Sequence, residues 1–298
     1  MLSFRDGQPS MSTPDAKPAL YLVGTPIGNL EDITLRALRV LKEVDLIACE
    51  DTRQTQKLLN HFTITTRTTS YHEHNEAAKS AELVKAIQEG ASVALVTDAG
   101  MPGISDPGYR LITLAIQQGV PVVPIPGASA FLMALVASGL STDSFRFNGF
   151  LPAKRGERRE ALESIKDSPR TQSFYEAPHR IVETLQDVAE ICGASRNVVV
   201  AREVTKLHEE FLRGRAAEVL EALKAREVVK GEITLLIGKA EATDAHVGTG
   251  TLARPSVRQR VEQIMAEEKL DEKAALKKVA KERGVSKSEA YRELQRSR

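Results

Sequence analysis

Cysteine is scarce, because Cys49 and Cys192 are the only two in 298 residues and they fall in separate predicted elements. A disulfide framework and a zinc cluster are therefore not expected, and a reducing cytoplasm fits best. Long apolar runs are lacking too, since nowhere do about 18 uninterrupted apolar residues occur. Residues 1–17 hold charges and prolines but no apolar signal-peptide core. We expect a disordered leader there, no standard secretion signal and no membrane span.

Net charge is almost absent, at +1, but it is unevenly distributed. Residues 254–298 carry 13 Lys and Arg against 8 Asp and Glu, a net +5, which leaves −4 for the rest. A basic tail beside a neutral-to-acidic body indicates contact with a polyanion. A solvated helical face would have a similar composition, so both interpretations stay open.

The first half of the chain alternates short apolar runs with helical spacing. The predicted strands cover residues 20–23, 45–49, 92–96 and 120–124. The predicted helices cover residues 35–44, 76–89 and 111–118. This alternation favours βαβ units and a mainly parallel sheet, so we expect an α/β domain over residues 18–144.

The chain changes character after residue 144. Residues 145–169 read as a linker that leads into a helix, and a second α/β domain is expected over residues 145–243. Its predicted strands cover residues 171–175, 197–201 and 233–237. Its predicted helices cover residues 181–191 and 216–225.

The C-terminal part begins with a glycine- and threonine-containing linker, residues 244–255. Residues 256–298 then read as a small, basic helical segment. Within it, Gly284 is a turn glycine and Ser286 a candidate N-cap, at the spacing of a helix-turn-helix motif. A plain three-helix cap is the competing interpretation, because this spacing has many accidental matches.

Three glycine- and proline-containing turns follow predicted strands and are the most informative features. They cover Gly24–Asp32, Thr97–Gly108 and Pro124–Ala130. Glycine lets the backbone approach a ligand closely, and proline fixes the neighbouring geometry. Ligands bind at strand ends in open α/β sheets, so the turns can build one small-molecule pocket. Turns that only connect strands are the structural alternative.

The first turn is not a dinucleotide-binding fingerprint. Gly24 and Gly28 are followed by Glu50 and Asp51, but Pro26 lies inside the turn and the third glycine is missing. Carboxylates at the next strand end can still hold a ribose or an amino-acid-bearing nucleoside.

Two aspartates lie in the second turn, where the constrained loop points to a ligand or a partner surface. Asp98 could accept hydrogen bonds from a ribose or an ammonium group. Asp106 could be a base or an Asx-turn residue, since aspartate before proline is common in turns.

Acidic, basic and imidazole side chains follow two strands of the second half, where a cleft between domains should open. Glu176, His179, Lys206 and His208 are candidates for proton handling or phosphate contact. Surface histidines beside acids are often only solvated. A metal site is poorly supported, because the only close histidine pair, at positions 72 and 74, has no third ligand signalled.

With these residues in view, the chain resembles the ribosomal RNA small-subunit methyltransferase I family, in the tetrapyrrole-methylase-like class of S-adenosylmethionine enzymes. The resemblance runs from about residue 18 to the C-terminus. It is carried by the motifs GTPIGNL (24–30), EDTR (50–53), TDAGMPGISDPG (97–108), PGASA (126–130), FYEAPHR (174–180) and REVTK (202–206).

The resemblance implies a two-domain α/β methylase of the tetrapyrrole-methylase type (class III), generally a homodimer, with S-adenosylmethionine bound between the domains. It implies 2′-O-methylation of a cytidine in the decoding region of 16S ribosomal RNA, cytidine 1402, within the small ribosomal subunit. The implied cofactor-binding residues are Gly24, Thr25, Pro26, Ile27, Asp98, Ala99, Gly100, Met101, Pro102, Ser129, Ala130, Tyr175 and Thr234.

For the reaction we expect a base near the methyl group, with Glu176 as first choice and Asp106 and His208 behind it. RNA phosphates are expected to meet basic side chains, with stacking secondary at an aromatic content of 4%. The candidates are Arg155, Arg180 and Lys206, with Lys287 and Arg292 in the tail, and Phe150 and Tyr175 for stacking.

Two alternatives remain at the level of sequence. A methylase of a small acceptor such as a tetrapyrrole would not need the basic tail. A non-catalytic RNA-binding factor would not require the three costly turns.

Overall fold

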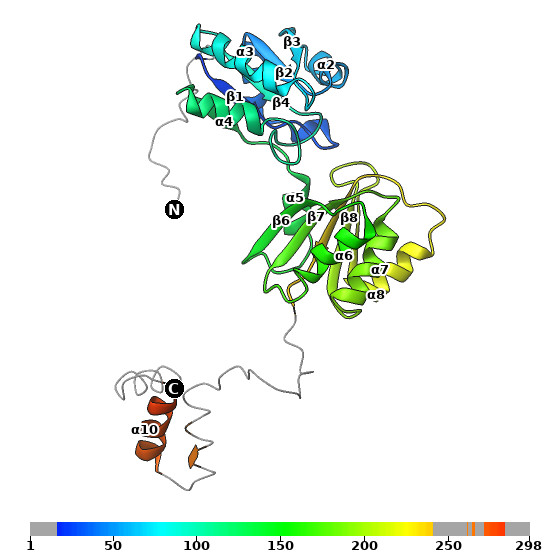
Figure 1. The fold of residues 1–298 in the computed structure, drawn as a ribbon. Helices are drawn as coiled ribbons and strands as arrows, with labels where there is room; N and C mark the ends of the chain where they lie inside the picture. Colours follow the sequence, from blue (N-terminus) through cyan, green and yellow to red (C-terminus); the bar gives the residue numbers. More distant parts are fainter. Residues whose placement is uncertain (1–16, 241–260, 262–263, 266–270, 284–298) are drawn as a thin grey trace, which may run out of the picture. The chain divides into compact units, whose positions relative to one another are not determined.

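The computed structural model describes residues 17–240, 261, 264–265 and 271–283, drawn in colour in Figure 1. The chain divides into two units, residues 1–241 and 242–298, and each is described by itself. Among the described residues, no helix is long and apolar enough to cross a membrane.

The first sheet is five-stranded and parallel throughout, with the order β3-β2-β4-β1-β5. Its strands are β1 (Leu20–Val23), β2 (Leu46–Cys49), β3 (Thr68–Ser70), β4 (Val93–Val96) and β5 (Val122–Ile125). The elements that connect them are η1 (Leu30–Asp32), α1 (Leu35–Glu43), α2 (Thr52–His61), α3 (Glu76–Gln88) and α4 (Tyr109–Gln117).

Both faces of the first sheet are buried, which explains why its strands read as continuous apolar runs. Successive side chains point to opposite faces, so Tyr21 packs with the α1 residues Val40 and Leu41, whereas Leu20 packs with Leu83 and Leu111 of α3 and α4. Because all five strands are parallel, their carboxyl ends meet at one edge, where the three predicted turns leave the sheet.

The second sheet has the order β6-β7-β10-β8-β9, and only β6 and β7 are parallel. Its strands are β6 (Phe145–Phe150), β7 (Thr171–Glu176), β8 (Asn197–Arg202), β9 (Glu210–Arg215) and β10 (Ile233–Ile237). The remaining helices of this unit are α5 (Ala130–Val136), α6 (Arg155–Glu163), α7 (Ile181–Ile191) and α8 (Ala216–Lys224). The mainly parallel sheet expected for the first half of the chain is confirmed, whereas the second sheet, whose pairing was not predicted, is mainly antiparallel.

The second sheet has a different neighbour on each face. Ile233, Leu235 and Ile237 of β10 point into a core with helices α6, α7 and α8. Leu236 of the same strand points to the other face, where α5 packs. Ile27, from the first turn, joins this smaller core. The helix that follows the third turn therefore packs on the second sheet, close to β6 and β7 in Figure 1.

The predicted α/β architecture is confirmed, but the linker over residues 145–169 is wrong in its first part. Phe145–Phe150 forms β6, which pairs with β7 and changes register between Phe147 and Phe150. Gly149, at φ +70°, takes the left-handed conformation within that irregular stretch. Glycine and proline near this strand gave the sequence the look of a loop, whereas α6 agrees with the predicted helix.

The C-terminal unit contains α10 (Glu272–Arg283), capped by Asp271, whose Oδ1 accepts a hydrogen bond from the Ala274 amide at 2.7 Å. Val261 and Ile264 pack against Leu276 and Val279 of this helix. The leader, the 244–255 linker and the second half of the helix-turn-helix pattern, with Lys287 and Arg292, lie outside the described residues.

Candidate active site

The predicted convergence of the three turns is confirmed. The Thr25 amide donates to the Gly100 carbonyl at 2.9 Å, and the Gly100 amide donates back to the Thr25 carbonyl at 3.2 Å. The Thr25 hydroxyl also donates to the Thr97 carbonyl at 3.1 Å. A Cβ atom on Gly24 would lie 2.6 Å from the Gly127 Cα, so the first and third turns touch through backbone alone.

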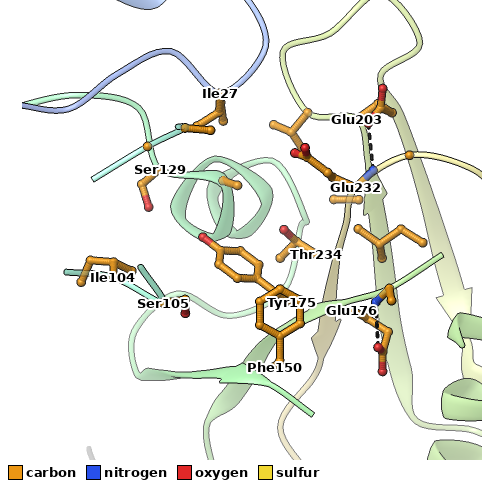
Figure 2. Close-up of a pocket in the computed structure, with 18 of the residues that line it drawn as sticks. Ile27, Ile104, Ser105, Ser129, Phe150, Tyr175, Glu176, Glu203, Glu232 and Thr234 are labelled. Atoms are coloured by element: carbon orange, nitrogen blue, oxygen red, sulfur yellow. Dashed lines mark hydrogen bonds between the residues drawn. The ribbon is translucent and has the colours of Figure 1, made fainter. Parts of the chain in front are cut away.

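A cavity of about 620 Å³ opens beside these turns and is lined by both halves of the unit. Figure 2 shows Ile27 and Ser129 on one side of it, and Tyr175 and Thr234 on another. This volume lies in the range of small-molecule and cofactor sites. The expected cofactor residues that line the cavity are Ile27, Ala99, Gly100, Met101, Ser129, Ala130, Tyr175 and Thr234.

The other expected cofactor residues do not line the cavity. Gly24, Thr25 and Pro26 stand behind its wall, where they join the turns. Asp98 is exposed, and its carboxylate accepts a hydrogen bond from the Asp51 amide at 3.2 Å. Pro102 is buried in the second turn.

The charge of the lining is one-sided. Asp106, Glu176, Glu203 and Glu232 line the cavity, and no lysine or arginine is among the described residues that do. The rest of the wall is mostly apolar, with hydroxyls from Ser105, Ser129, Tyr175 and Thr234. Arg180 offsets the charge of Glu176, and Lys206 offsets part of the charge of Glu203 and Glu232. The remaining acidic and apolar lining suits a cationic ligand with an apolar body better than one rich in phosphate.

Aromatic side chains form one wall. The rings of Phe150 and Tyr175 lie edge to face with centroids 5.5 Å apart, and Tyr175 also meets Phe147 at 4.9 Å. Burial raises the pKa of the Tyr175 phenol, so this side chain stays neutral. Phe150 remains 59% exposed and lies at the edge of the cavity. This wall can shield a reaction from water.

Asp106 is the titratable group of the cavity whose properties depart most from the ordinary. Burial, with the negative charges of Glu50 and Asp98 adding to it, raises its pKa to about 6. Burial and the charge of Asp98 raise the pKa of Glu50 as well. A carboxylate with a pKa near neutrality is a stronger base than an ordinary aspartate and is still mostly ionised at pH 7.

Both carboxylate oxygens of Glu176, the first choice for the base, accept hydrogen bonds from neighbouring groups. Its Oε1 accepts hydrogen bonds from the Ala177 amide at 2.7 Å and from the Arg180 guanidinium, and its Oε2 accepts one from the Thr184 hydroxyl at 2.7 Å. Its side chain is 0% exposed. In Figure 2 it points away from Tyr175 and Phe150. These contacts make Glu176 a residue that holds the turn after β7.

The same bonds change the assignment of Arg180, which was expected to meet RNA. Its guanidinium binds Glu176 and also donates to the Leu151 carbonyl at 3.2 Å, and its side chain is only 15% exposed. Local sequence placed both residues correctly at a strand end. It did not show that the glutamate and the arginine, four residues apart, satisfy each other.

Lys206 is also paired rather than free for phosphate. Its Nζ lies 3.0 Å from Glu203 Oε1 and 3.2 Å from Glu232 Oε2. A Cβ on Gly28 would come 2.2 Å from the Lys206 Cγ, so the loop between β8 and β9 packs on the first turn. His208 is exposed on that loop and does not line the cavity.

Arg155 keeps an exposed guanidinium. Its Nε lies 3.4 Å from Asp187 Oδ1, a carboxylate that Arg158 and Arg159 also bind, and its side chain is 66% exposed. Of the expected RNA contacts that the structure describes, Arg155 alone presents its charge to solvent. His179 lies in the turn between β7 and α7 and is outside the cavity lining.

Several lining residues were not among the expected cofactor residues, although Phe150 was expected to stack on RNA and others, such as Ser105 and Glu203, lie in the motifs that carry the resemblance. Glu203 has φ +52°, and its Oε1 accepts a hydrogen bond from the Glu232 amide at 2.8 Å. Gly231 has no room for a side chain, because a Cβ there would lie 2.5 Å from the Glu203 Cγ. The additional lining residues are Ile104, Ser105, Phe150, Ala177, Pro178, Ala201, Glu203, Val204, Gly231, Glu232 and Ile233.

No group of three or more metal-ligating side chains occurs in the part of the chain that the structure describes. His72 and His74 pack as rings, edge to face, with centroids 5.8 Å apart.

Comparisons with known proteins agree with this geometry. Residues 19–220 match the family model of the tetrapyrrole (corrin/porphyrin) methylases. The chain is 50% identical over 286 residues to a "Ribosomal RNA small subunit methyltransferase I" of Halalkalibacterium halodurans, which covers 95% of this chain and 97% of that relative. It is 44% identical over 282 residues to the Escherichia coli O157:H7 protein of the same name, covering 94% and 96%.

Solved structures share the fold at low sequence identity. The cobalt precorrin-4 methyltransferase CbiF is 17% identical with a TM-score of 0.55, and the match covers 74% of this chain and 95% of that one. The uroporphyrin-III C-methyltransferase of Thermus thermophilus, complexed with S-adenosylhomocysteine, is 21% identical with a TM-score of 0.52, covering 74% and 98%. These matches show that the chain shares the fold of these two enzymes over 74% of its length.

Proposed function

Because the chain belongs to the ribosomal RNA small subunit methyltransferase I family, within the tetrapyrrole methylases, we propose that it methylates 16S ribosomal RNA with S-adenosylmethionine as methyl donor. The acceptor that we propose is the ribose 2′-oxygen of a cytidine in the decoding region. The reaction would take place where the small ribosomal subunit is made, in the cytoplasm.

The observation that carries this proposal is the cavity between the turns and the second sheet. It has the volume of a cofactor site, and its acidic, partly apolar lining suits a ligand with a sulfonium and an ammonium group. Gly100, at φ +87°, lets the backbone of the second turn line this cavity, and Gly24 and Gly127 let the first and third turns touch behind it. Ser129 and Thr234 supply hydroxyls for its polar groups.

S-adenosylmethionine supplies a sulfonium methyl group that is already activated toward nucleophiles. The protein then has to align the acceptor oxygen and exclude water, and alignment alone contributes about 7 to 11 kcal/mol in favourable cases. Tyr175, which packs edge to face on Phe147 and Phe150, helps to exclude water at one wall. Asp106 accepts the proton of the 2′-hydroxyl as that oxygen attacks, a step that typically contributes about 10² to 10⁴-fold.

Glu176 acts in this scheme through the backbone. Its bonds to Ala177, Arg180 and Thr184 fix the end of β7, which carries Tyr175 into the cavity wall. It is a positioning residue, and Asp106 takes the place of the base.

RNA binding is proposed to be mainly electrostatic. Arg155 presents a charge beside α6, and the basic residues of the C-terminal tail, including Lys287 and Arg292, add salt-sensitive affinity that is blind to sequence.

We further propose that the protein is a homodimer. Leu132, Met133 and Val136 of α5 and Phe145 of β6 are exposed apolar side chains, and the rings of Phe131 and Phe145 join the two elements at 6.5 Å. Light scattering of the full chain tests this, and a monomer at micromolar concentration would contradict it.

The function is tested with tritium-labelled S-adenosylmethionine and three acceptors: small ribosomal subunits, naked 16S RNA and a tetrapyrrole such as uroporphyrinogen III. Label in either RNA-containing acceptor supports the proposal and shows whether assembly is required. Label in the tetrapyrrole alone, or cofactor binding without transfer to any RNA, would overturn it.

A further inference from the structure

A second cavity, of about 640 Å³, lies beside the first, between the end of the second turn and helices α3 and α4. Ser105 and Asp106 line both cavities, so the two share a wall at the group that we propose as base. A group-transfer enzyme needs donor and acceptor in adjoining sites, with the reacting atoms at their boundary. The first cavity suits the donor, which leaves the second for the acceptor.

An exposed tyrosine stands at this second cavity. Tyr109, the first residue of α4, is 78% exposed, and none of the ring contacts found among the described residues involves it. Proteins that read single-stranded RNA stack unpaired bases on such rings, which compensates for stacking lost from neighbouring bases. The position of Tyr109 on the cavity lining therefore favours a flat, unstacked base as the occupant.

The charges of the cavity indicate which part of a nucleotide it holds. Glu73, Glu76 and Asp106 line it together with one cation, Arg110. Arg110 Nε lies 3.1 Å from Glu76 Oε1, so these two charges offset each other. The net negative lining disfavours a phosphate. The amino group of cytosine or adenine is a hydrogen-bond donor that a carboxylate accepts well, whereas uracil presents an oxygen at that place.

We propose that this second cavity is the acceptor site, where the target nucleotide of the RNA lies unstacked with its base on Tyr109 and its amino group bonded to Glu73. The proposal rests on the proposed function and deepens it, because it names the residues that select an amino-bearing base. Its ribose then lies toward the Ser105 and Asp106 wall, beside the donor cavity.

The first test measures methyl transfer to small ribosomal subunits by the full chain and by Tyr109→Ala and Tyr109→Phe. Loss of one stacked base lowers kcat/KM for the subunits by about 5- to 150-fold in Tyr109→Ala, whereas Tyr109→Phe keeps the ring and stays near wild type. The dissociation constant of S-adenosylmethionine, measured by calorimetry, stays unchanged in both variants. A Tyr109→Ala variant with wild-type kcat/KM would overturn the proposal.

The second test addresses Glu73 through base selectivity, which a merely structural role would not change. Small subunits are reconstituted with cytosine or uracil at the methylated position, and the ratio of the two kcat/KM values is compared. Glu73→Gln should narrow this ratio about tenfold, because glutamine can also donate to the uracil oxygen. Glu82→Gln is the matched control, since Glu82 lies on α3, the helix that follows Glu73, has a side chain that is 64% exposed and is outside the lining.

The outcomes separate the two proposals. If the wild-type chain methylates no RNA, the proposed function fails. If it methylates small subunits and Glu73→Gln keeps the wild-type selectivity, the function stands and the acceptor site is wrong.

Discussion

Replacing Asp106 with asparagine should remove activity and at the same time stabilise the fold. The side chain keeps its shape but loses the capacity to accept a proton, so kcat/KM for the RNA acceptor should fall by about 10² to 10⁴-fold. The affinity for S-adenosylmethionine should change little, because the other lining carboxylates remain.

The gain in stability follows from the sign of the pKa shift. The pKa of Asp106 is raised from 3.8 to about 6 by burial and by the charges of Glu50 and Asp98. The folded protein therefore holds this proton more tightly than the unfolded chain does, and stability falls as pH rises from about 4 to about 6. Above pH 6 the ionised carboxylate destabilises the fold by at most about 3 kcal/mol, a penalty that Asp106→Asn removes.

The assay combines two pH series. In the wild type, kcat/KM should rise about tenfold per pH unit up to a midpoint near 6 and then level off, since the base must be ionised. Thermal unfolding at pH 7 should show a higher Tm for Asp106→Asn than for the wild type. An active Asp106→Asn variant whose kcat/KM still falls below pH 6 as in the wild type would refute the reasoning. A variant that is inactive only because it unfolds at a lower temperature than the wild type would refute it too.

Other side chains of the site give predictions that differ in kind. Gly24→Ala should weaken S-adenosylmethionine binding at least tenfold, measured by calorimetry, because the added Cβ would lie 2.6 Å from Gly127 Cα and would push the turns apart; wild-type affinity would contradict the contact. Glu176→Gln should lower Tm by several degrees by weakening the buried pair with Arg180, and it should leave the pH midpoint of kcat/KM near 6, whereas a shifted midpoint would restore Glu176 as the base. Glu232→Gln should weaken the binding of S-adenosylmethionine, whose sulfur is cationic, about two- to fivefold more than that of S-adenosylhomocysteine, whose sulfur is uncharged. Equal losses of affinity for the two ligands would argue against a charge effect.

Local chemistry made the turns predictable. Gly24, Gly100 and Gly127, each with a proline close by, follow apolar runs. The backbone conformations that glycine and proline allow are a property of these residues themselves. The buried strands of the first sheet were predictable for a similar reason, since both faces are covered and the runs are continuous. The strand β6 was missed because Asn148 and Gly149 interrupt the alternation of its phenylalanines, where the register changes.

The chemistry of individual carboxylates was not predictable from position in the chain. Glu176 and Asp106 both follow strands, but what each can do depends on its neighbours in space. Thr184 and Arg180 satisfy Glu176, whereas the charges around Asp106 come from Glu50, after β2, and from Asp98, in the same turn as Asp106. Sequence reasoning found both candidates, with Glu176 as first choice, and the contacts of Glu176 are our reason for proposing Asp106 in its place.

The most direct test of the account measures RNA from cells. Small-subunit RNA is isolated from cells that lack the protein and from cells complemented with the wild type or with Asp106→Asn, and its nucleosides are identified by mass spectrometry. The account predicts that one 2′-O-methylcytidine disappears without the protein, returns with the wild type and does not return with Asp106→Asn. Persistence of that nucleoside in cells without the protein, or its full return with Asp106→Asn, would contradict the account.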